Sequence, residues 1–167
     1  MKIAYVSQEQ KLFARTIREN VTHSVISEMY SDEDIWSALA QAEIKDWVAT
    51  LPLGLDTVLD DGERTVSGGQ LQRLRLAHLF CTCKDADFVI LDEVLSAVDE
   101  NNREILIRRL QEFLNGKTAV VVTHHSEVLR ICDNIHTMEK KRGLCSLRKS
   151  DNSSHSRLSM FMSFRQN

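Results

Sequence analysis

Two adjacent carboxylates follow an unbroken apolar run in the middle of the chain. The run from Phe88 to Leu91 leads directly into Asp92 and Glu93, and such a run is typical of a strand covered on both faces in a parallel sheet. Sheets of this kind bind ligands at the carboxyl ends of their strands. Asp92 there suits Mg²⁺, which prefers oxygen ligands, and Glu93 could polarise an attacking water as a general base. The alternative is a strand that ends in two solvated acids.

A histidine follows a second apolar run. Thr118 to Thr123 also predicts a buried parallel strand, and His124 comes directly after it, with His125 next. A histidine at a strand end can donate a hydrogen bond to a transferring phosphoryl group, where charge develops in the transition state. A purely structural role for His124 is the alternative, and His125 is assigned no function.

A glycine-rich turn is the third candidate. It consists of Ser67, Gly68, Gly69 and Gln70, and a helical pattern of apolar residues begins at Leu71. A turn that opens a helix points free backbone N–H groups and the positive end of the helix dipole outward, which favours an anion. Because glycines let a phosphate approach the backbone closely, this turn is a candidate phosphate site, although Ser-Gly-Gly is also a common helix start.

The elements that must position these residues form an α/β pattern. A helix predicted over residues 101–114 joins the two buried strands into a βαβ unit. Residues 16–80 show mostly helical patterns, including a capping box at Ser31 and Asp34. The sequence therefore predicts a parallel sheet with a mostly helical insert. Its four predicted strands cover residues 3–6, 88–91, 118–123 and, more weakly, 134–138.

Charge divides the chain into a body and a tail. From Lys140 onward seven Lys or Arg residues stand against the single acid Asp151, whereas the formal net charge of the whole chain is −3. The body is therefore acidic, and since duplex binding needs a concentrated basic face, we expect no nucleic-acid partner. Residues 140–167 are basic, rich in serine and without periodicity, so we expect a disordered tail.

Targeting and cysteine patterns are uninformative about chemistry. The residues after Met1 show no apolar signal-peptide core, and no run approaches the roughly 18 apolar residues that span a bilayer. We therefore expect neither a signal peptide nor a transmembrane segment in this chain. The cysteines lack paired C-x-x-C spacing and are expected to be reduced thiols without a metal. They are Cys81, Cys83, Cys132 and Cys145.

Taken together, the motifs resemble those of the ATP-binding cassette (ABC) ATPase family, in their order as well as in their types. The resemblance covers about residues 1 to 140 and is closest to exporter-type members. It matches Asp92 to the Walker B aspartate, Glu93 to the catalytic glutamate and His124 to the switch histidine. The other matching segments are Tyr5 to Gln8 (Q-loop), Leu12 to Val21 (the stretch after it), Ser67 to Gln70 (signature) and Ser96 to Asp99 (D-loop).

The resemblance implies a fold and its division. The expected fold is α/β, an incomplete P-loop NTPase (RecA-like) parallel sheet with an inserted α-helical subdomain. The partial ATPase domain would span residues 1–139, with the helical signature subdomain at about 10–80 and the Walker B and switch-histidine core at 81–139. The basic, Ser-rich tail would follow at 140–167. The sequence departs from the family in one main respect, because it contains no G-x-x-x-x-G-K-[ST] phosphate-binding loop.

The resemblance also implies cofactors, partners and residue roles. ATP and Mg²⁺ would be the cofactors; the partners would be a second nucleotide-binding domain, arranged head to tail, and a transmembrane domain at the cytosolic face of a membrane. Without its own P-loop, the isolated chain is expected to be inactive. The alternative is an inactive partner subunit that lends its signature to an intact ABC ATPase. The implied residues are Glu93 and His124 for catalysis, Asp92 and Gln8 for the metal, and Gln8, Ser67, Gly68, Gly69, Gln70 and Asp99 for the nucleotide.

The missing P-loop strand leads to an expectation about folding. In the family this strand lies beside the strand that carries the switch histidine, so its absence would leave residues 119–122 as an exposed apolar edge. Such an edge recruits other chains. We therefore expect the isolated chain to be poorly soluble.

Overall fold

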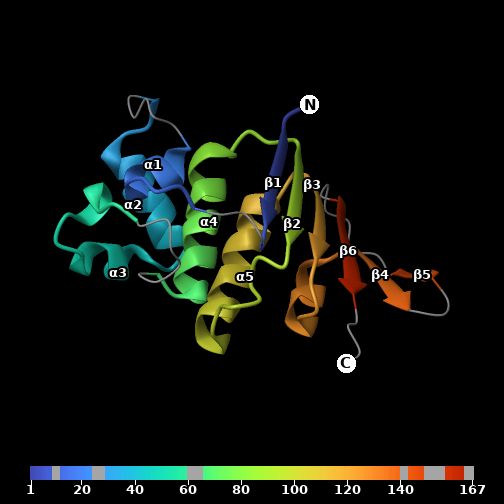
Figure 1. The fold of residues 1–167 in the computed structure, drawn as a ribbon. Helices are drawn as coiled ribbons and strands as arrows, with labels where there is room; N and C mark the ends of the chain where they lie inside the picture. The colour runs from blue at the N-terminus through green and yellow to red at the C-terminus, as the bar shows by residue number, and fades with distance from the viewer. Residues whose placement is uncertain (9–11, 24–28, 60–65, 140–142, 149–156, 164–167) are drawn as a thin grey trace.

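The computed structural model describes the chain except for residues 9–11, 24–28, 60–65, 140–142, 149–156 and 164–167 (Figure 1). The strands are β1 (Ile3–Ser7), β2 (Phe88–Asp92), β3 (Thr118–Val122), β4 (Asn134–Glu139), β5 (Gly143–Arg148) and β6 (Arg157–Ser163). The helices are α1 (Ile17–Thr22), α2 (Asp32–Gln41), α3 (Lys45–Thr50), α4 (Gly68–Thr82) and α5 (Glu100–Leu114). Two 3₁₀ helices, η2 (Gly54–Asp56) and η3 (Ser126–Ile131), complete the described elements.

The strands form one sheet in the order β1-β2-β3-β6-β4-β5. All neighbouring pairs are parallel except β4 and β5, which run antiparallel. Ser7 pairs in register with Asp92, which pairs with Val122. The carboxyl ends of β1, β2 and β3 therefore meet at one edge of the sheet, as the predicted βαβ unit requires.

One face of the sheet packs against helices. Figure 1 shows the helices gathered to the left of the strands, with α4 and α5 nearest to them. On the covered face the side chains of β1, β2 and β3 are buried, namely Ala4, Val6, Val89, Leu91, Ala119 and Val121. This core continues into α4 and α5 through Leu76, Phe80, Leu106 and Leu110.

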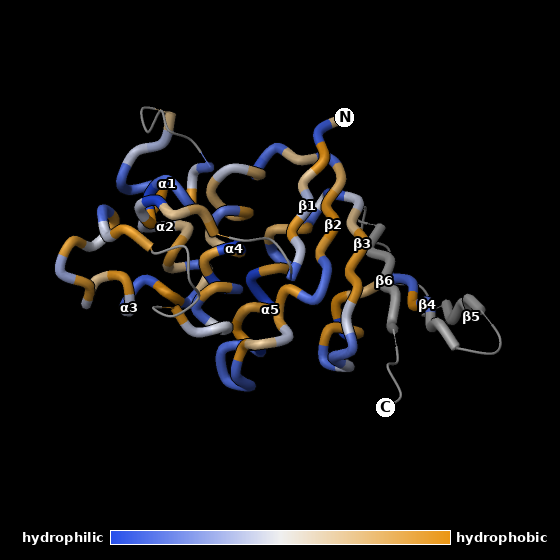
Figure 2. The backbone as a smooth tube through the Cα atoms, in the orientation of Figure 1, coloured by the Kyte–Doolittle hydropathy of each residue, from blue (hydrophilic) through white to orange (hydrophobic). Residues whose placement is uncertain are grey.

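The opposite face of β1–β3 is partly bare. Ile3 and Tyr5 are 58% and 56% exposed, and Phe88, Ile90 and Val120 are only half-buried. Figure 2 shows β2 and β3 coloured largely as hydrophobic along their length. The two strands that were predicted to be covered on both faces, β2 and β3, are therefore only partly covered on this face by the part of the chain that the structure describes, and β1 is exposed there. We call this apolar surface, made by Ile3, Tyr5, Phe88, Ile90 and Val120, the bare face.

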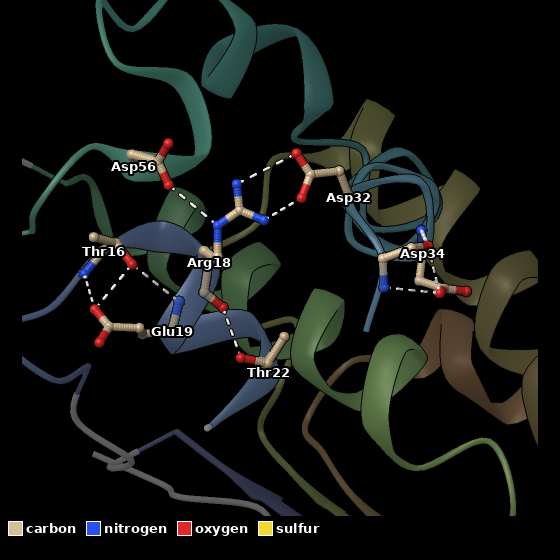
Figure 3. A network of polar contacts seen from close by, with 8 residues as sticks. Thr16, Arg18, Glu19, Thr22, Asp32, Asp34 and Asp56 are labelled. Atoms are coloured by element: carbon tan, nitrogen blue, oxygen red, sulfur yellow. Dashed lines mark hydrogen bonds and ion pairs between the residues drawn. The ribbon is translucent and has the colours of Figure 1, made fainter. Parts of the chain in front are cut away.

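The inserted helices pack on α4 and are held together by one arginine. Arg18 on α1 donates from Nε to Asp56 of η2 at 3.1 Å and forms a two-pronged ion pair with Asp32 at the start of α2 (Figure 3). The pKa of Asp32 is lowered by this hydrogen bond. The predicted capping box is also confirmed, because Ser31 and Asp34 bond each other's backbone N–H groups. These contacts fix three helical segments around the apolar side of the insert.

The C-terminal segment differs from its prediction. Two strands, β5 and β6, lie within the residues that we expected to be disordered. β6 pairs with β3 over the register Thr118↔Arg157 to Val122↔Phe161, so the predicted open edge at residues 119–122 is closed. Leu158, Met160 and Met162 recur with the period of a strand, and Phe161 between them is apolar as well. The expectation of poor solubility rested on this open edge, and the structure therefore does not support it.

A stacked pair of histidines joins α1 to α4. The rings of His23 and His78 lie 3.5 Å apart between centroids, and Nδ1 of His78 lies 2.9 Å from the carbonyl oxygen of Val21. Burial first, and the neighbouring His78 second, lower the pKa of His23 from 6.5 to about 4. Burial also lowers the pKa of His78. The stack thus favours two neutral imidazoles.

We expect this pair to make stability depend on pH. The unfolded chain takes up protons first, so the stabilisation is complete above pH 6.5 and is lost as the pH falls towards about 4. The thermal midpoint should fall over this window. The fall should be only a few degrees, because the His23 side chain is exposed and solvent weakens the effect of its protonation. His23→Asn retains a residue that tolerates the left-handed backbone (φ 50°), and it should flatten the profile. An undiminished fall in the variant would contradict this.

Candidate functional site

The predicted residues of the first candidate site meet at the carboxyl edge of the sheet. The backbone N–H of Gln8 donates to the carbonyl oxygen of Asp92 at 3.0 Å, which ties the end of β1 to the end of β2. The N–H of Glu93 donates to the carbonyl oxygen of Val122 at 2.9 Å, which ties β2 to the end of β3. The parallel register therefore brings Gln8, Asp92, Glu93 and the residues after Val122 to one place.

The side chains of Glu93 and His124 are in direct contact. Nδ1 of His124 lies 2.9 Å from Oε1 and 2.8 Å from Oε2 of Glu93, with hydrogen-bond geometry to Oε1. Glu93 has a left-handed backbone with φ 52°, which turns the chain sharply after β2. Since the contact uses Nδ1, Nε2 is the nitrogen of His124 that remains for another partner. His124 is 52% exposed and Glu93 19%, so the pair is open on the histidine side.

Carboxylate oxygens with few hydrogen bonds lie at the same place. Oε2 of Glu93 is buried and lies 2.8 Å from Nδ1 of His124, but it makes no hydrogen bond of good geometry to a described residue. The half-buried carboxylate of Asp92 likewise makes no hydrogen bond or ion pair within the described part of the chain. Mg²⁺ in phosphate-binding sites is usually held by one or two carboxylates together with waters and phosphates. The arrangement fits such an ion, and no cluster of three or more possible metal ligands occurs among the described residues.

The Ser-Gly-Gly turn opens α4 as predicted. Oγ of Ser67 accepts from the N–H of Gln70 at 3.2 Å, and Oε1 of Gln70 accepts from the N–H of Ser67 at 2.8 Å. This capping box is structural, but it leaves the N–H groups of Gly68 and Gly69 without an acceptor among the described residues. Ser67 is exposed. The first turn of α4 therefore keeps two donors that an anion could take.

The two glycines of this turn touch the loop after β2. A Cβ added to Gly69 would lie 2.8 Å from the backbone oxygen of Ala97, and one added to Gly68 would lie 3.3 Å from the Cβ of Ala97. The first distance is too short for a carbon and a fixed backbone atom. Close packing of α4 on this loop therefore requires glycine at position 69.

Gly69→Ala should separate α4 from the loop. We expect it to lower the free energy of unfolding by about 2 kcal/mol, which is the order of cost for overpacking a fixed backbone contact. Gly68→Ala, a chemically identical change one residue earlier, should cost clearly less because its neighbour is a side-chain methyl group. Urea unfolding of the two variants measures the difference, and equal costs would contradict the role assigned to Ala97.

Gln72 links the two halves of the site, and the sequence reasoning missed it. Its side chain is only 3% exposed. Nε2 donates to the carbonyl oxygen of Glu93 at 3.1 Å and to Oγ of Ser96 at 2.6 Å, while Oε1 accepts from the N–H of Ala97 at 2.7 Å. One amide on α4 thus fixes the backbone that presents Glu93.

Two arginines on α4 were also missed. Arg75, 7% exposed, donates from Nη1 to the carbonyl oxygen of Gln8 at 2.7 Å. Arg73 donates to the carbonyl oxygens of Gly69 at 3.2 Å and Glu43 at 2.8 Å. The available signal was a run of long polar residues inside a helix that must be buried, which calls for partners. Both position candidate site residues through the backbone.

Asp99 has a local role in the structure. It caps α5 by accepting from the N–H of Asn102 at 3.0 Å and from Nδ2 of Asn102 at 2.7 Å. The hydrogen bond from the Asn102 side chain is the main cause that lowers the pKa of Asp99. Asp99 is otherwise exposed, so its carboxylate faces solvent at the end of the loop that packs on Gly69.

The predicted residues therefore fall into two groups. Gln8, Asp92, Glu93 and His124 meet at the carboxyl edge of the sheet. The second group lies where α4 and α5 begin, and consists of Ser67, Gly68, Gly69, Gln70 and Asp99. No hydrogen bond joins the side chains of the two groups within the described residues, and Gln72 connects them through the loop 93–97.

The fold and the first group define a P-loop NTPase-like core, and the comparisons specify the family. The family profile for ABC transporters matches residues 1–96. The chain belongs to the ABC transporter family. A bacterial Atm1-family ABC exporter, solved with ATP bound, superposes with a TM-score of 0.70 at 25% identity, covering 80% of this chain and 23% of that one. The expected fold class is thereby confirmed.

Relatives from several organisms agree with this assignment. An uncharacterized ABC transporter ATP-binding protein, YwjA, of Bacillus subtilis is 37% identical over 134 residues, which are 80% of this chain and 23% of that protein. ABC transporter B family member 15 of Arabidopsis thaliana is 35% identical, over 83% of this chain and 11% of its own length. A multidrug resistance ABC transporter ATP-binding and permease protein of Lactococcus lactis is 32% identical over 139 residues, or 83% and 23%. The chain thus spans less than a quarter of these relatives and corresponds to part of their ATP-binding domain.

Proposed function

We propose that this chain forms one side of a Mg²⁺-dependent ATP-hydrolysing site that drives transport across a membrane. The observation that carries the proposal is the contact between Glu93 and His124 at the carboxyl edge of the sheet, beside the unpaired carboxylate of Asp92. Membership of the ABC transporter family supports the reading. The alternative of an inactive partner subunit is not favoured, because the relatives found are transporters.

Each residue has a distinct role in the proposed reaction. Asp92, together with Gln8, would hold Mg²⁺, which supplies positive charge to the phosphates. Glu93 would accept a proton from the attacking water, and its contact with Nδ1 of His124 keeps the carboxylate oriented. His124, which must carry a proton on Nε2 as well as on Nδ1 for this step, would donate from Nε2 to the transferring phosphoryl group, where negative charge develops.

The second group of residues would serve another nucleotide. Ser67, Gly68, Gly69 and Gln70 lie at the helix start with two free N–H donors, and Asp99 lies on the loop packed against it. We infer that this surface faces the ATP held by a second nucleotide-binding domain in a head-to-tail dimer.

This sequence contains no phosphate-binding P-loop, so we infer that another segment of polypeptide supplies it. The bare face supports this inference, because sheets made of parallel strands are normally covered on both sides. No described helix is long and apolar enough to cross a membrane. We propose that a transmembrane domain is the further partner, and that the site works at the cytosolic face.

A chimera tests the proposal. Residues 1–139 would replace the corresponding part of the Lactococcus lactis relative, to which this chain aligns over 139 residues. The remainder of that protein would supply the P-loop and the membrane parts. We expect the purified chimera to hydrolyse ATP, and the isolated chain to bind ATP analogues only weakly. A well-folded chimera without ATPase activity would contradict the proposal, as would ATP turnover by the isolated chain that depends on Glu93.

A further inference from the structure

The position of β6 in the sheet is unusual for its place in the chain. β6 is the last described strand, yet it lies in the interior of the sheet between β3 and β4 and runs parallel to both. It pairs with five residues of β3 and five of β4. Without it, β3 would present an open edge, and β4 and β5 would lose the pairing that joins them to the other described strands.

The sequence of β6 differs from that of the strands beside which it lies. β3 reads Thr-Ala-Val-Val-Val, whereas β6 reads Arg-Leu-Ser-Met-Phe-Met-Ser and contains no β-branched residue. Interior strands of parallel sheets are normally continuous apolar runs rich in β-branched residues. β6 therefore occupies an interior position of the sheet although its sequence has a low intrinsic propensity to form a strand.

The register nevertheless matches β6 to this particular sheet. Leu158 and Met160 pair with Ala119 and Val121, the buried residues of β3. Ser159 pairs with Val120, a residue of the bare face. Because paired residues in a sheet share a face, Leu158 and Met160 have the register of the covered face, whereas Ser159 and Phe161 have the register of the bare face.

We propose that the gap between β3 and β4 is a strand-binding site, and that its ligand is the segment 157–163 of the same chain. By occupying this gap, the segment closes the apolar edge of β3, which would otherwise pair with a second copy of the chain. Any other strand that is to pair with β3 at this edge must first displace it. The inference concerns strand pairing and does not depend on nucleotide binding.

The test compares two variants of the full chain that add the same charge. Met160→Asp places a carboxylate at an apolar position in register with the covered face, and Ser159→Asp places it one residue away, in register with the bare face. For Met160→Asp we expect at least about tenfold faster hydrogen exchange of the β3 amides, together with self-association in sedimentation velocity. Ser159→Asp should match the parent protein, and a synthetic peptide of residues 155–165 should restore slow exchange to Met160→Asp.

Two outcomes would overturn the proposal. One is identical behaviour of Met160→Asp and Ser159→Asp. The other comes from cross-linking, which keeps the test valid if Met160→Asp unfolds. Cysteines at the paired positions 120 and 159 should form a disulfide within one chain, since adjacent strands lie about 4.8 Å apart. A control pair at 118 and 163 lies out of register and should not react. A bond only between chains, or none, contradicts occupation by the chain's own segment.

Discussion

Glu93→Gln is expected to reduce the ATPase rate of the chimera by about 100-fold or more, the range that a general base contributes. Both oxygens of the carboxylate lie within 2.9 Å of Nδ1 of His124, and in the proposed function Oε2, which makes no hydrogen bond of good geometry to a described residue, would take a proton from water. Glutamine keeps the shape and the hydrogen-bonding capacity of the side chain but loses its basicity. Steady-state phosphate release from the purified chimera measures the change.

The matched control is Glu100→Gln. Glu100 is an exposed glutamate in the first turn of α5, seven positions further along the chain. Its replacement removes the same charge without touching the contact between Glu93 and His124, so the ATPase rate should stay near that of the parent chimera. Equal losses from both variants would point to overall charge and would contradict a specific role for Glu93.

Gln72→Leu is expected to lower the free energy of unfolding by about 3 kcal/mol. The substitution leaves the N–H of Ala97 and the carbonyl oxygen of Glu93 without their partner in a buried place, and each unpaired buried group costs about 1–3 kcal/mol. Leucine has nearly the same volume, so lost hydrogen bonds rather than an empty space determine the effect. Chemical denaturation of the isolated chain gives the value.

Gln41→Leu serves as the control for this change. Gln41 is the last residue of α2 and makes a long 3.4 Å contact to Ser37 at the surface. Its replacement should alter the free energy of unfolding by less than about 0.5 kcal/mol. If Gln72→Leu were equally mild, the loop after β2 would be held by its own contacts, and the link through Gln72 would be unimportant.

The sequence was most informative where local pattern determines structure. The apolar runs before Asp92 and His124 predicted two parallel strands, and the register of these strands placed their ends together. The helix predicted over residues 101–114 is found at Glu100–Leu114. Serine and glycine likewise marked the start of α4 at Ser67. In each case neighbouring residues fix both the backbone and the direction of the functional group.

The sequence did not predict the features whose position depends on residues far away along the chain. The long polar residues in α4 could indicate that Gln72 and Arg75 need partners, but not that these partners come from the loops after β2 and β1. β6 was missed for a similar reason. Residues 157–163 have weak strand propensity, and only the open edge of β3, which is formed by residues some forty positions earlier, selects the extended conformation.

The backbone of Glu93 is left-handed, and this conformation costs a residue with a β-carbon about 1 kcal/mol or more. Glycine or asparagine would adopt it more easily. Selection for thermal stability alone would therefore favour glycine or asparagine at this position. In the proposed function, some stability is thus lost at the position where a proton acceptor would lie beside His124.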